Sequence, residues 1–334
     1  MKQIKLLFLS LILLSFSSCY CQGEFLGVSA TKKMHAKLNR MKPKGLKGQL
    51  VFHTDYILSY NEGAEQANWV LYELTDKEVK KPMSRTDDFR YDPFIKTVSA
   101  EKEDYASSGY DRGHLAPAAD MHASKKVMSE SFYMSNMSPQ LPQFNRGIWK
   151  KLEERVRVWA EKNNTIYVVT GPVLTDGPYD SIGKNRVVVP KRYYKVVLVD
   201  NPGNDNDKMI SFLLENKGSK QALQKFVVST DQLEKITGLD FFPFIEDKQE
   251  ALLEASSDTN KWDFVSRPTK VKKDQQFMQN KEQAKKAQTP KTKVKKVIDR
   301  GVQCKGLTKA GKRCKKHTKN PNGYCSLHQS QAKK

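Results

Sequence analysis

The chain has 334 residues and a formal net charge of +21, from 58 Lys and Arg against 37 Asp and Glu. Its length and its 38% hydrophobic residues suit one large domain or two smaller ones and exclude a wholly disordered chain. The charge is concentrated at one end: residues 268–334 carry 20 basic and 3 acidic side chains, whereas residues 1–267 carry 38 and 34. A basic tail favours polyanions such as nucleic acid or an anionic surface, and a solvated, disordered tail is the plainer alternative.

The first 21 residues have the pattern of a signal peptide. Lys2 and Lys5 precede an apolar run over Leu6–Phe16, which is too short to span a bilayer and is followed by small residues. We expect cleavage before Gln22 and a secreted, periplasmic or cell-envelope location. Lipidation of Cys19 and an uncleaved anchor are the alternatives. No later segment is long and apolar enough to predict a transmembrane helix.

Residues 48–262 have the patterns of a mixed α+β domain, after a polar extension over 22–47. Strands are predicted over Gln49–His53, Tyr56–Tyr60, Trp69–Leu74, Thr165–Val173, Val187–Pro190 and Tyr193–Asp200. Helices are predicted over Ile148–Ala160 and Gln224–Thr237. Because strands and helices do not alternate regularly, we expect an antiparallel sheet core.

Residues with acid–base, metal-binding and phosphate-binding chemistry lie between positions 112 and 153. His114 can hold a vacant ring nitrogen at neutral pH and act as a general base. Asn136 offers a neutral carbonyl oxygen to a hard cation such as Mg²⁺, which keeps several of its waters. Glu153 can hold a metal-bound water from its predicted helix, and Arg112 can bind phosphate with two donors. Singly, a structural histidine, a turn asparagine and a solvated glutamate are the plainer explanations, so the hypothesis depends on the joint pattern.

Three sequence elements together resemble the DNA/RNA non-specific endonuclease family. Asp111–His114 reads Asp-Arg-Gly-His, Ser135–Gln140 reads Ser-Asn-x-x-Pro-Gln, and Asn145–Glu153 reads Asn-x-Gly-x-Trp-x-x-Leu-Glu. Weaker similarity extends the resemblance over residues 48–245. The resemblance implies a ββα-metal (His-Me finger) active site and Mg²⁺-dependent hydrolysis of DNA and RNA, with Mn²⁺ as a possible substitute and 5′-phosphate products. A homodimer is possible. The alternative is a secreted nucleic-acid-binding protein whose nuclease fold is inactive.

The resemblance also implies a role for each site residue. His114 would be the general base, Asn136 the direct Mg²⁺ ligand, and Glu153 the residue that assists metal-bound waters. Arg112 would contact the site. Arg157 and an upstream arginine, Arg85 in preference to Arg90, would bind phosphate.

The C-terminal residues 301–334 form a small Cys/His module after a basic linker over 263–300. Cys304, Cys314, Cys325 and His328 are separated by nine, ten and two residues. Three thiolates and one imidazole make a closed structural zinc site, with His317 as a competing ligand. Free thiols, or one disulfide with a cysteine left over, are the alternatives. We expect this module to hold nucleic acid beside the catalytic domain.

Overall fold

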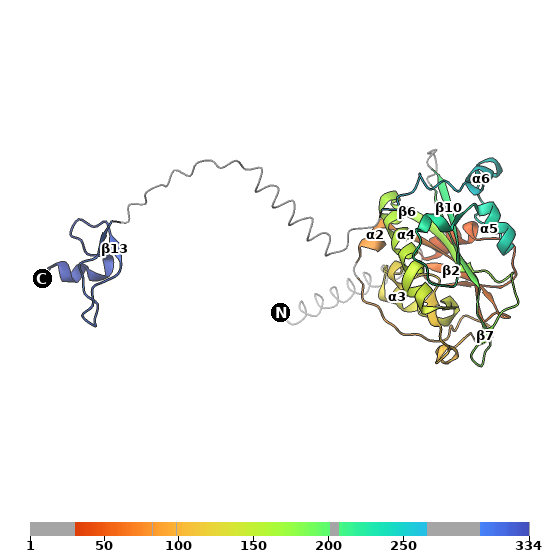
Figure 1. Cartoon of the computed structure of the whole chain (residues 1–334), viewed down its shortest axis with the longest axis horizontal. Coiled ribbons are helices and arrows are strands. Elements are labelled where there is room, and N and C mark those ends of the chain that lie inside the picture. Colours follow the sequence, from red (N-terminus) through yellow and green to blue (C-terminus); the bar gives the residue numbers. More distant parts are fainter. Residues whose placement is uncertain (1–30, 82, 98, 201–206, 266–300, 334) are drawn as a thin grey trace, which may run out of the picture. The chain divides into compact units, whose positions relative to one another are not determined.

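The computed structural model describes residues 31–81, 83–97, 99–200, 207–265 and 301–333 (Figure 1). The chain divides into two compact units, residues 1–266 and 267–334. The predicted signal peptide and most of the predicted linker lie outside the described residues, and the predicted domain limits at 48, 262 and 301 stay predictions. Within the described part of the chain, no helix has the length and apolar character needed to cross a bilayer.

A seven-stranded antiparallel sheet is the centre of the larger unit, which confirms the predicted α+β class. The strands are β1 (Gln49–Phe52), β2 (Tyr56–Asn61), β3 (Gln66–Thr75), β6 (Thr165–Pro172), β9 (Arg192–Val199), β10 (Lys208–Glu215) and β11 (Val227–Val228). They lie in the order β1-β2-β3-β6-β9-β10-β11. Some neighbouring strands are joined by tight turns and others by long connections, and the connection between β3 and β6 contains the three motifs.

Helices cover both faces of this sheet. On one face α4 (Lys150–Asn163) buries Leu152, Val156 and Trp159 against the sheet. On the other face lie the helix over residues 31–41, α5 (Thr230–Thr237) and α6 (Asp247–Glu254), and Leu38 and Leu233 belong to this second core. Because both faces of the central strands are buried, those strands are mostly apolar and show no regular alternation of apolar and polar residues.

Two parts of the sheet differ from the sequence-based expectation. The helix predicted over Gln224–Thr237 begins only at Thr230, because Ser229 caps it by accepting a hydrogen bond from the Gln232 backbone at 3.1 Å. The preceding residues form η5 (Leu223–Phe226) and the edge strand β11, which pairs with β10. Strand β10 is not predicted, because a short apolar run buried on both faces has no period that distinguishes strand from helix.

The remaining elements of this unit are short and lie around the sheet. They are α2 (Asp76–Lys80), η1 (Lys102–Tyr105), β4 (Asp111–His114), η2 (Ala118–Asp120), α3 (Lys125–Glu130), η3 (Met134–Asn136), β5 (Met137–Gln140), η4 (Phe144–Trp149), β7 (Ser181–Ile182) and β8 (Val187–Val188). Strands β4 and β5 pair with each other, and η4 leads directly into α4. This strand–strand–helix unit, β4–β5–α4, contains all three motifs.

The smaller unit contains β12 (Val302–Gln303), β13 (His317–Thr318) and η6 (Ser326–Lys333). Strands β12 and β13 pair as an antiparallel ribbon. The buried hydrophobic cluster among its described residues consists of Cys304, Cys314 and Cys325. Residues 301–333 are too few to bury the apolar surface that a stable fold needs, so a metal or other crosslink is expected.

Candidate active site

His114 lies at the end of β4, with its ring between two phenylalanines. The ring centroid is 4.9 Å from that of Phe132 and 5.8 Å from that of Phe89, and both contacts are edge-on. Within the described residues, its buried Nε2 has no hydrogen-bond partner. Burial, followed by the positive charges of Arg85 and Arg112, lowers the pKa of His114 from 6.5 to about 3, although the Arg112 carbonyl opposes the shift. The ring is therefore neutral at physiological pH and can accept a proton.

This environment makes a prediction about stability. As the pH falls below 6.5, unfolded chains bind a proton at His114 before folded chains do, so the free energy of unfolding should fall between pH 6.5 and about 3. Replacing His114 by Asn should reduce the loss of stability between pH 7 and pH 5 by about 1–2 kcal/mol. Urea unfolding of both proteins at the two pH values, in EDTA, measures this difference. An unchanged pH dependence in the variant would contradict the buried, neutral ring.

Asn136 does not line the cleft, so the predicted direct contact with Mg²⁺ is not supported by its position. Its side chain is fully buried. The amide oxygen accepts a hydrogen bond from the Ala116 backbone at 2.9 Å, and the amide nitrogen donates to the carbonyls of Ala116 and Ser131 at 2.9 and 2.8 Å. Asn136 therefore fixes the backbone that follows His114 and has no face open to a hydrated cation.

Asn145, which the motif pattern does not identify as a ligand, lies in the cleft instead. Its amide nitrogen donates to the Asp111 carboxylate at 2.9 Å. Arg146 holds the same carboxylate through two donors, at 2.8 and 2.6 Å. Partial burial disfavours the charge on Asp111, but the hydrogen bonds from Arg146 and Asn145 outweigh it and lower the pKa. The sequence feature that could have identified Asn145 is its place as the first residue of the Asn-x-Gly-x-Trp-x-x-Leu-Glu element.

The first turns of α4 carry Glu153 and Arg157 into the cleft. Arg157 donates to the fully buried carboxylate of Asp120 at 2.8 Å, and Tyr72 donates to the other oxygen of that carboxylate at 2.8 Å. Burial raises the pKa of Glu153, and the nearby cations Lys195 and Arg157 oppose the rise. These contacts fix the arginine close to the glutamate, on one face of the helix.

Lys195 is a buried cation that interacts electrostatically with Glu153. Its ammonium is fully buried on β9 and lies 4.8 Å from the Trp149 ring centroid. Burial lowers its pKa, whereas the charge of Glu153 acts in the opposite direction. Sequence reasoning did not identify this residue, because a lysine in a strand gives no sign that its side chain points into the core.

The resulting cleft has a volume of about 470 Å³. Its polar lining consists of Arg85, Arg112, His114, Asn145, Arg146, Lys150, Glu153 and Arg157. The predicted catalytic and phosphate-binding residues thus meet in one place, whereas Asn136 lies outside it. Arg85 is the upstream arginine at the cleft, whereas Arg90 bonds to Asp88 and to the Ser129 carbonyl at 2.8 and 2.9 Å. Five cationic side chains and the Glu153 carboxylate line the cleft. Asp87, Asp111 and Asp120 pair with Arg85, Arg146 and Arg157, but the cations still outnumber these acidic groups, so the cleft can attract an anion.

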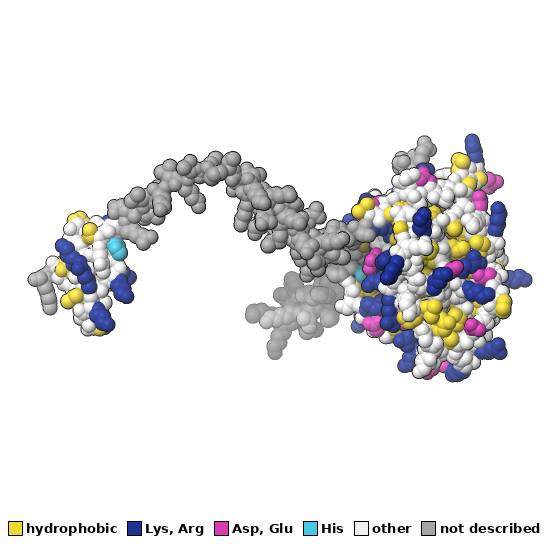
Figure 2. Space-filling model, in the orientation of Figure 1, with side chains coloured by type: hydrophobic (Ala, Val, Ile, Leu, Met, Phe, Trp, Pro, Cys, Tyr) yellow, Lys and Arg dark blue, Asp and Glu magenta, His cyan; other side chains and the backbone are white. Residues whose placement is uncertain are grey.

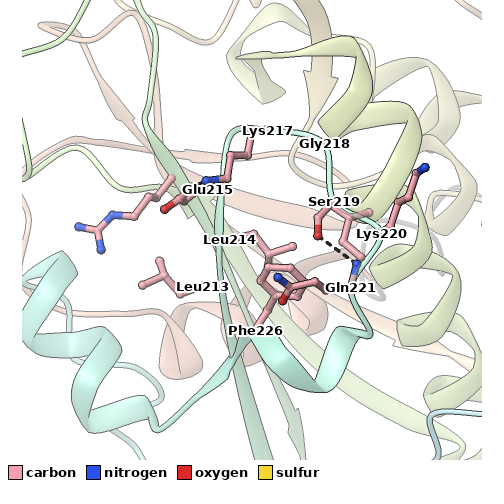
Figure 3. Close-up of a pocket in the computed structure, with 11 residues that line it drawn as sticks. Leu213, Leu214, Glu215, Lys217, Gly218, Ser219, Lys220, Gln221 and Phe226 are labelled. Atoms are coloured by element: carbon pink, nitrogen blue, oxygen red, sulfur yellow. Dashed lines mark hydrogen bonds and ion pairs between the residues drawn. The ribbon is translucent and has the colours of Figure 1, made fainter.

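A larger cavity, of about 760 Å³, lies elsewhere on the same unit and shares no residue with this cleft. Leu213, Leu214 and Phe226 line it, and the segment over 217–221 forms one side (Figure 3). Within that segment Ser219 accepts a hydrogen bond from the Gln221 backbone at 3.1 Å. Its lining contains none of the predicted site residues.

The smaller unit brings four metal-ligand side chains together. The ligand atoms of Cys304, Cys314, Cys325 and His328 all lie within 4.8 Å of one another. The sulfurs of Cys314 and Cys325 are 4.0 Å apart, and His328 Nδ1 is 3.6 and 3.3 Å from the sulfurs of Cys304 and Cys325. A disulfide would need about 2.0 Å, whereas tetrahedral ligands around zinc lie roughly 3.8 Å apart at a Zn–S length of 2.3 Å. The exposed His317 is outside this cluster.

Comparisons with known proteins agree with this geometry. Residues 35–248 match the family model of the DNA/RNA non-specific endonucleases, and residues 301–334 match a domain of unknown function, DUF5763. The mitochondrial nuclease EXOG of Danio rerio is 37% identical over 212 residues, which cover 59% of this chain and 62% of that protein. The mitochondrial endonuclease G of Homo sapiens is 34% identical over 216 residues, 60% of this chain and 72% of that protein. A nuclease of Nostoc sp. is 33% identical and covers 63% and 78% of the two chains.

A solved structure agrees as well. The crystal structure of the EndoG/EndoGI complex contains a chain with 34% identity and a TM-score of 0.57, over 62% of this chain and 90% of that chain. The chain thus spans 62% of the EXOG relative and most of this structural one. The names of the EXOG and endonuclease G relatives place those proteins in mitochondria, which contradicts the secreted or cell-envelope location, including lipidation at Cys19, expected from the first 21 residues.

Proposed function

Because the chain belongs to the DNA/RNA non-specific endonuclease family, we propose that it hydrolyses phosphodiester bonds in DNA and RNA, with Mg²⁺ as cofactor and His114 as general base. One observation carries the proposal: a vacant imidazole nitrogen, an amide ligand and five cationic side chains line a single cleft. Hydrolysis needs an activated water, neutralised phosphate charge and orientation of both. The cleft contains a group suited to each task.

The side chains that suit Mg²⁺ are Asn145 and, through a water, Glu153. Mg²⁺ prefers oxygen ligands and keeps several waters, so one amide oxygen and one outer carboxylate are a reasonable set. Asp111 holds the amide nitrogen of Asn145, which leaves the amide oxygen as its ligand atom. When bound, the cation would neutralise charge on the phosphate and stabilise the leaving oxygen. Mn²⁺ accepts the same oxygen ligands and could substitute.

The proton transfer is assigned to His114. Its unpartnered Nε2 can take a proton from the attacking water, and Phe89 and Phe132 restrict the ring to one orientation. A ring with so low a pKa is a weak base in the free protein. A bound phosphodiester anion would offset the charges of Arg85 and Arg112 and raise the basicity of the ring. Substrate binding and base strength are therefore coupled.

The cationic residues account for the breadth of substrates. Arg85, Arg112 and Arg157 present guanidinium groups that suit phosphate oxygens. Contacts to phosphate position a polymer but do not read its bases. A site that binds through the backbone should accept DNA and RNA, single or double stranded.

The test is cleavage of plasmid DNA and of a long RNA by the full chain with Mg²⁺, with Mn²⁺ and with EDTA. We expect cleavage of both polymers in either metal and none above background in EDTA. Tight binding of both polymers without cleavage in any metal would instead favour the alternative, an inactive nucleic-acid-binding protein.

A second metal is proposed for the smaller unit. Three thiolates and an imidazole favour Zn²⁺ over Mg²⁺, because soft sulfur ligands bind zinc and hard cations take oxygen. Burial disfavours the Cys304 thiolate, but N–H donors from Cys325 and Gly306, at 3.2 and 3.3 Å, outweigh it and lower the pKa to about 6. A sulfur that is already ionised near neutral pH is ready to bind the metal.

A further inference from the structure

In the described part of the smaller unit, the exposed basic side chains lie between residues 305 and 319. Residues 301–334 contain no Asp or Glu. Its described cationic side chains are all exposed, and they are Lys305, Lys309, Lys312, Arg313, Lys315, Lys316 and Lys319. Lys and Arg side chains are spread over the visible face of this unit (Figure 2). Because residues 301–334 contain no acidic side chain to offset these cations, this surface attracts polyanions.

The same short segments that carry these cations are held by the Cys/His cluster. Cys304 donates from its backbone to the Lys316 carbonyl at 2.8 Å, and Cys314 donates to the Gly306 carbonyl at 2.9 Å. These bonds close the segment over 305–316 into a loop that is tied at Cys304 and Cys314. Of the other two ligands, Cys325 immediately precedes η6 and His328 lies within it. A metal at the cluster would thus fix the loop to the rest of the unit.

We propose that this zinc-held unit is a second nucleic-acid site, which binds the phosphate backbone through the loop over residues 305–316. The charges alone would also suit an anionic membrane, so the choice of nucleic acid rests on the nuclease function proposed above. Nucleic acid is favoured since the other unit of the same chain has a cation-lined cleft suited to a phosphodiester. Lysines act as mobile point charges on phosphate, so binding should be independent of sequence and sensitive to salt.

Such a site would act by keeping the polymer near the catalytic unit. A chain bound at one unit is present at the other at a raised effective concentration. The benefit exists only for polymers long enough to contact both units. Cleavage of long DNA at low concentration should therefore depend on the loop, whereas cleavage of a short oligonucleotide should not.

The binding experiment uses the full chain with His114→Ala, which is expected to bind without cutting. Four loop lysines are replaced together: Lys309, Lys312, Lys315 and Lys316→Gln. The matched control replaces four exposed lysines of the larger unit that lie outside the catalytic cleft: Lys220, Lys225, Lys235 and Lys248→Gln. Affinity of the zinc-loaded chain for a 40-base-pair duplex, without added Mg²⁺ or Mn²⁺ and without chelator, is measured by fluorescence anisotropy over a range of salt concentrations.

We expect the loop variant to bind at least about tenfold more weakly near 0.1 M salt, and the slope of log K against log salt to fall by roughly 0.9 for each phosphate that the loop no longer neutralises. The control should change little. Equal affinity and slope in the loop variant and the control would overturn the proposal. So would a loop variant that keeps its DNA affinity but loses binding to vesicles containing phosphatidylglycerol.

The role of the metal is tested in the same chain. The full chain should contain one zinc, and Co²⁺ in its place should give the absorption of a thiolate-bound ion. Cys314→Ser should lose the zinc and reduce DNA affinity to that of the loop variant. Zinc-free chain that binds DNA as tightly as zinc-loaded chain would contradict the metal's role. With His114 intact, both tail variants should still cut a short oligonucleotide, so a failure here is distinct from a failure of the nuclease function.

Discussion

Replacing His114 by Ala is expected to lower kcat for plasmid cleavage in Mg²⁺ by about 10²–10⁴-fold, the usual contribution of a general base. The affinity for DNA should change only a few-fold, because the cations of the cleft remain in place. The ring lies between Phe89 and Phe132, so its loss leaves a small gap and also removes the hydrogen bond to the Arg112 carbonyl. Steady-state cleavage rates and anisotropy titrations of the two proteins measure the two effects separately.

His122→Ala is the matched control for this variant. His122 bonds through Nδ1 to the Lys81 carbonyl at 2.8 Å, and it does not line the cleft. Its replacement should leave the rate of cleavage almost unchanged. If His114→Ala retained Mg²⁺-dependent plasmid degradation close to that of the parent, another group would have to activate the water.

The two asparagines should fail in different ways. Loss of a residue that only supports a metal ligand costs roughly 10–100-fold in metal affinity or activity. Because Asn145 is proposed to bind Mg²⁺ directly, Asn145→Ala is expected to weaken activation of cleavage by Mg²⁺ by more than this. The fold should be little affected, because Asn145 is only half-buried and Arg146 still holds Asp111. Titration of the cleavage rate with Mg²⁺, together with thermal unfolding, measures both properties.

Asn136→Ala should instead destabilise the domain. It leaves the N–H and carbonyl of Ala116 and the carbonyl of Ser131 without their partner in a buried region. At about 1–3 kcal/mol for each unsatisfied group, we expect a loss of about 3 kcal/mol or more, which lowers Tm by roughly 6–12 °C. The Asn136→Ala molecules that remain folded should show an unaltered dependence of cleavage rate on Mg²⁺. A stable Asn136→Ala protein with greatly weakened Mg²⁺ activation would restore Asn136 as the metal ligand.

Much of the fold and the site could be predicted from sequence. The strands from Gln49 to Leu74 and from Thr165 to Val173 are long apolar runs with clear turns around them, so their type was evident. The edge of the sheet was harder. Ser229 marks the start of α5, and the β-branched pair Val227–Val228 before it favours a strand. The pairing of these two valines with β10, however, is a long-range contact that no local pattern encodes.

The family, the fold class and the identity of most groups that line the cleft follow from the amino-acid sequence, because three contiguous motifs carry them. Cys304, Cys314, Cys325 and His328 are also evident there, since metal ligands leave a spacing pattern. Which asparagine faces the cleft, in contrast, depends on the folded chain. Both stand in motifs of similar weight, but Asn136 points inward to the backbone of Ala116 and Asn145 is held at the surface by Asp111. Side-chain direction depends on partners 20 and 34 residues away, and spacing along the chain does not record it.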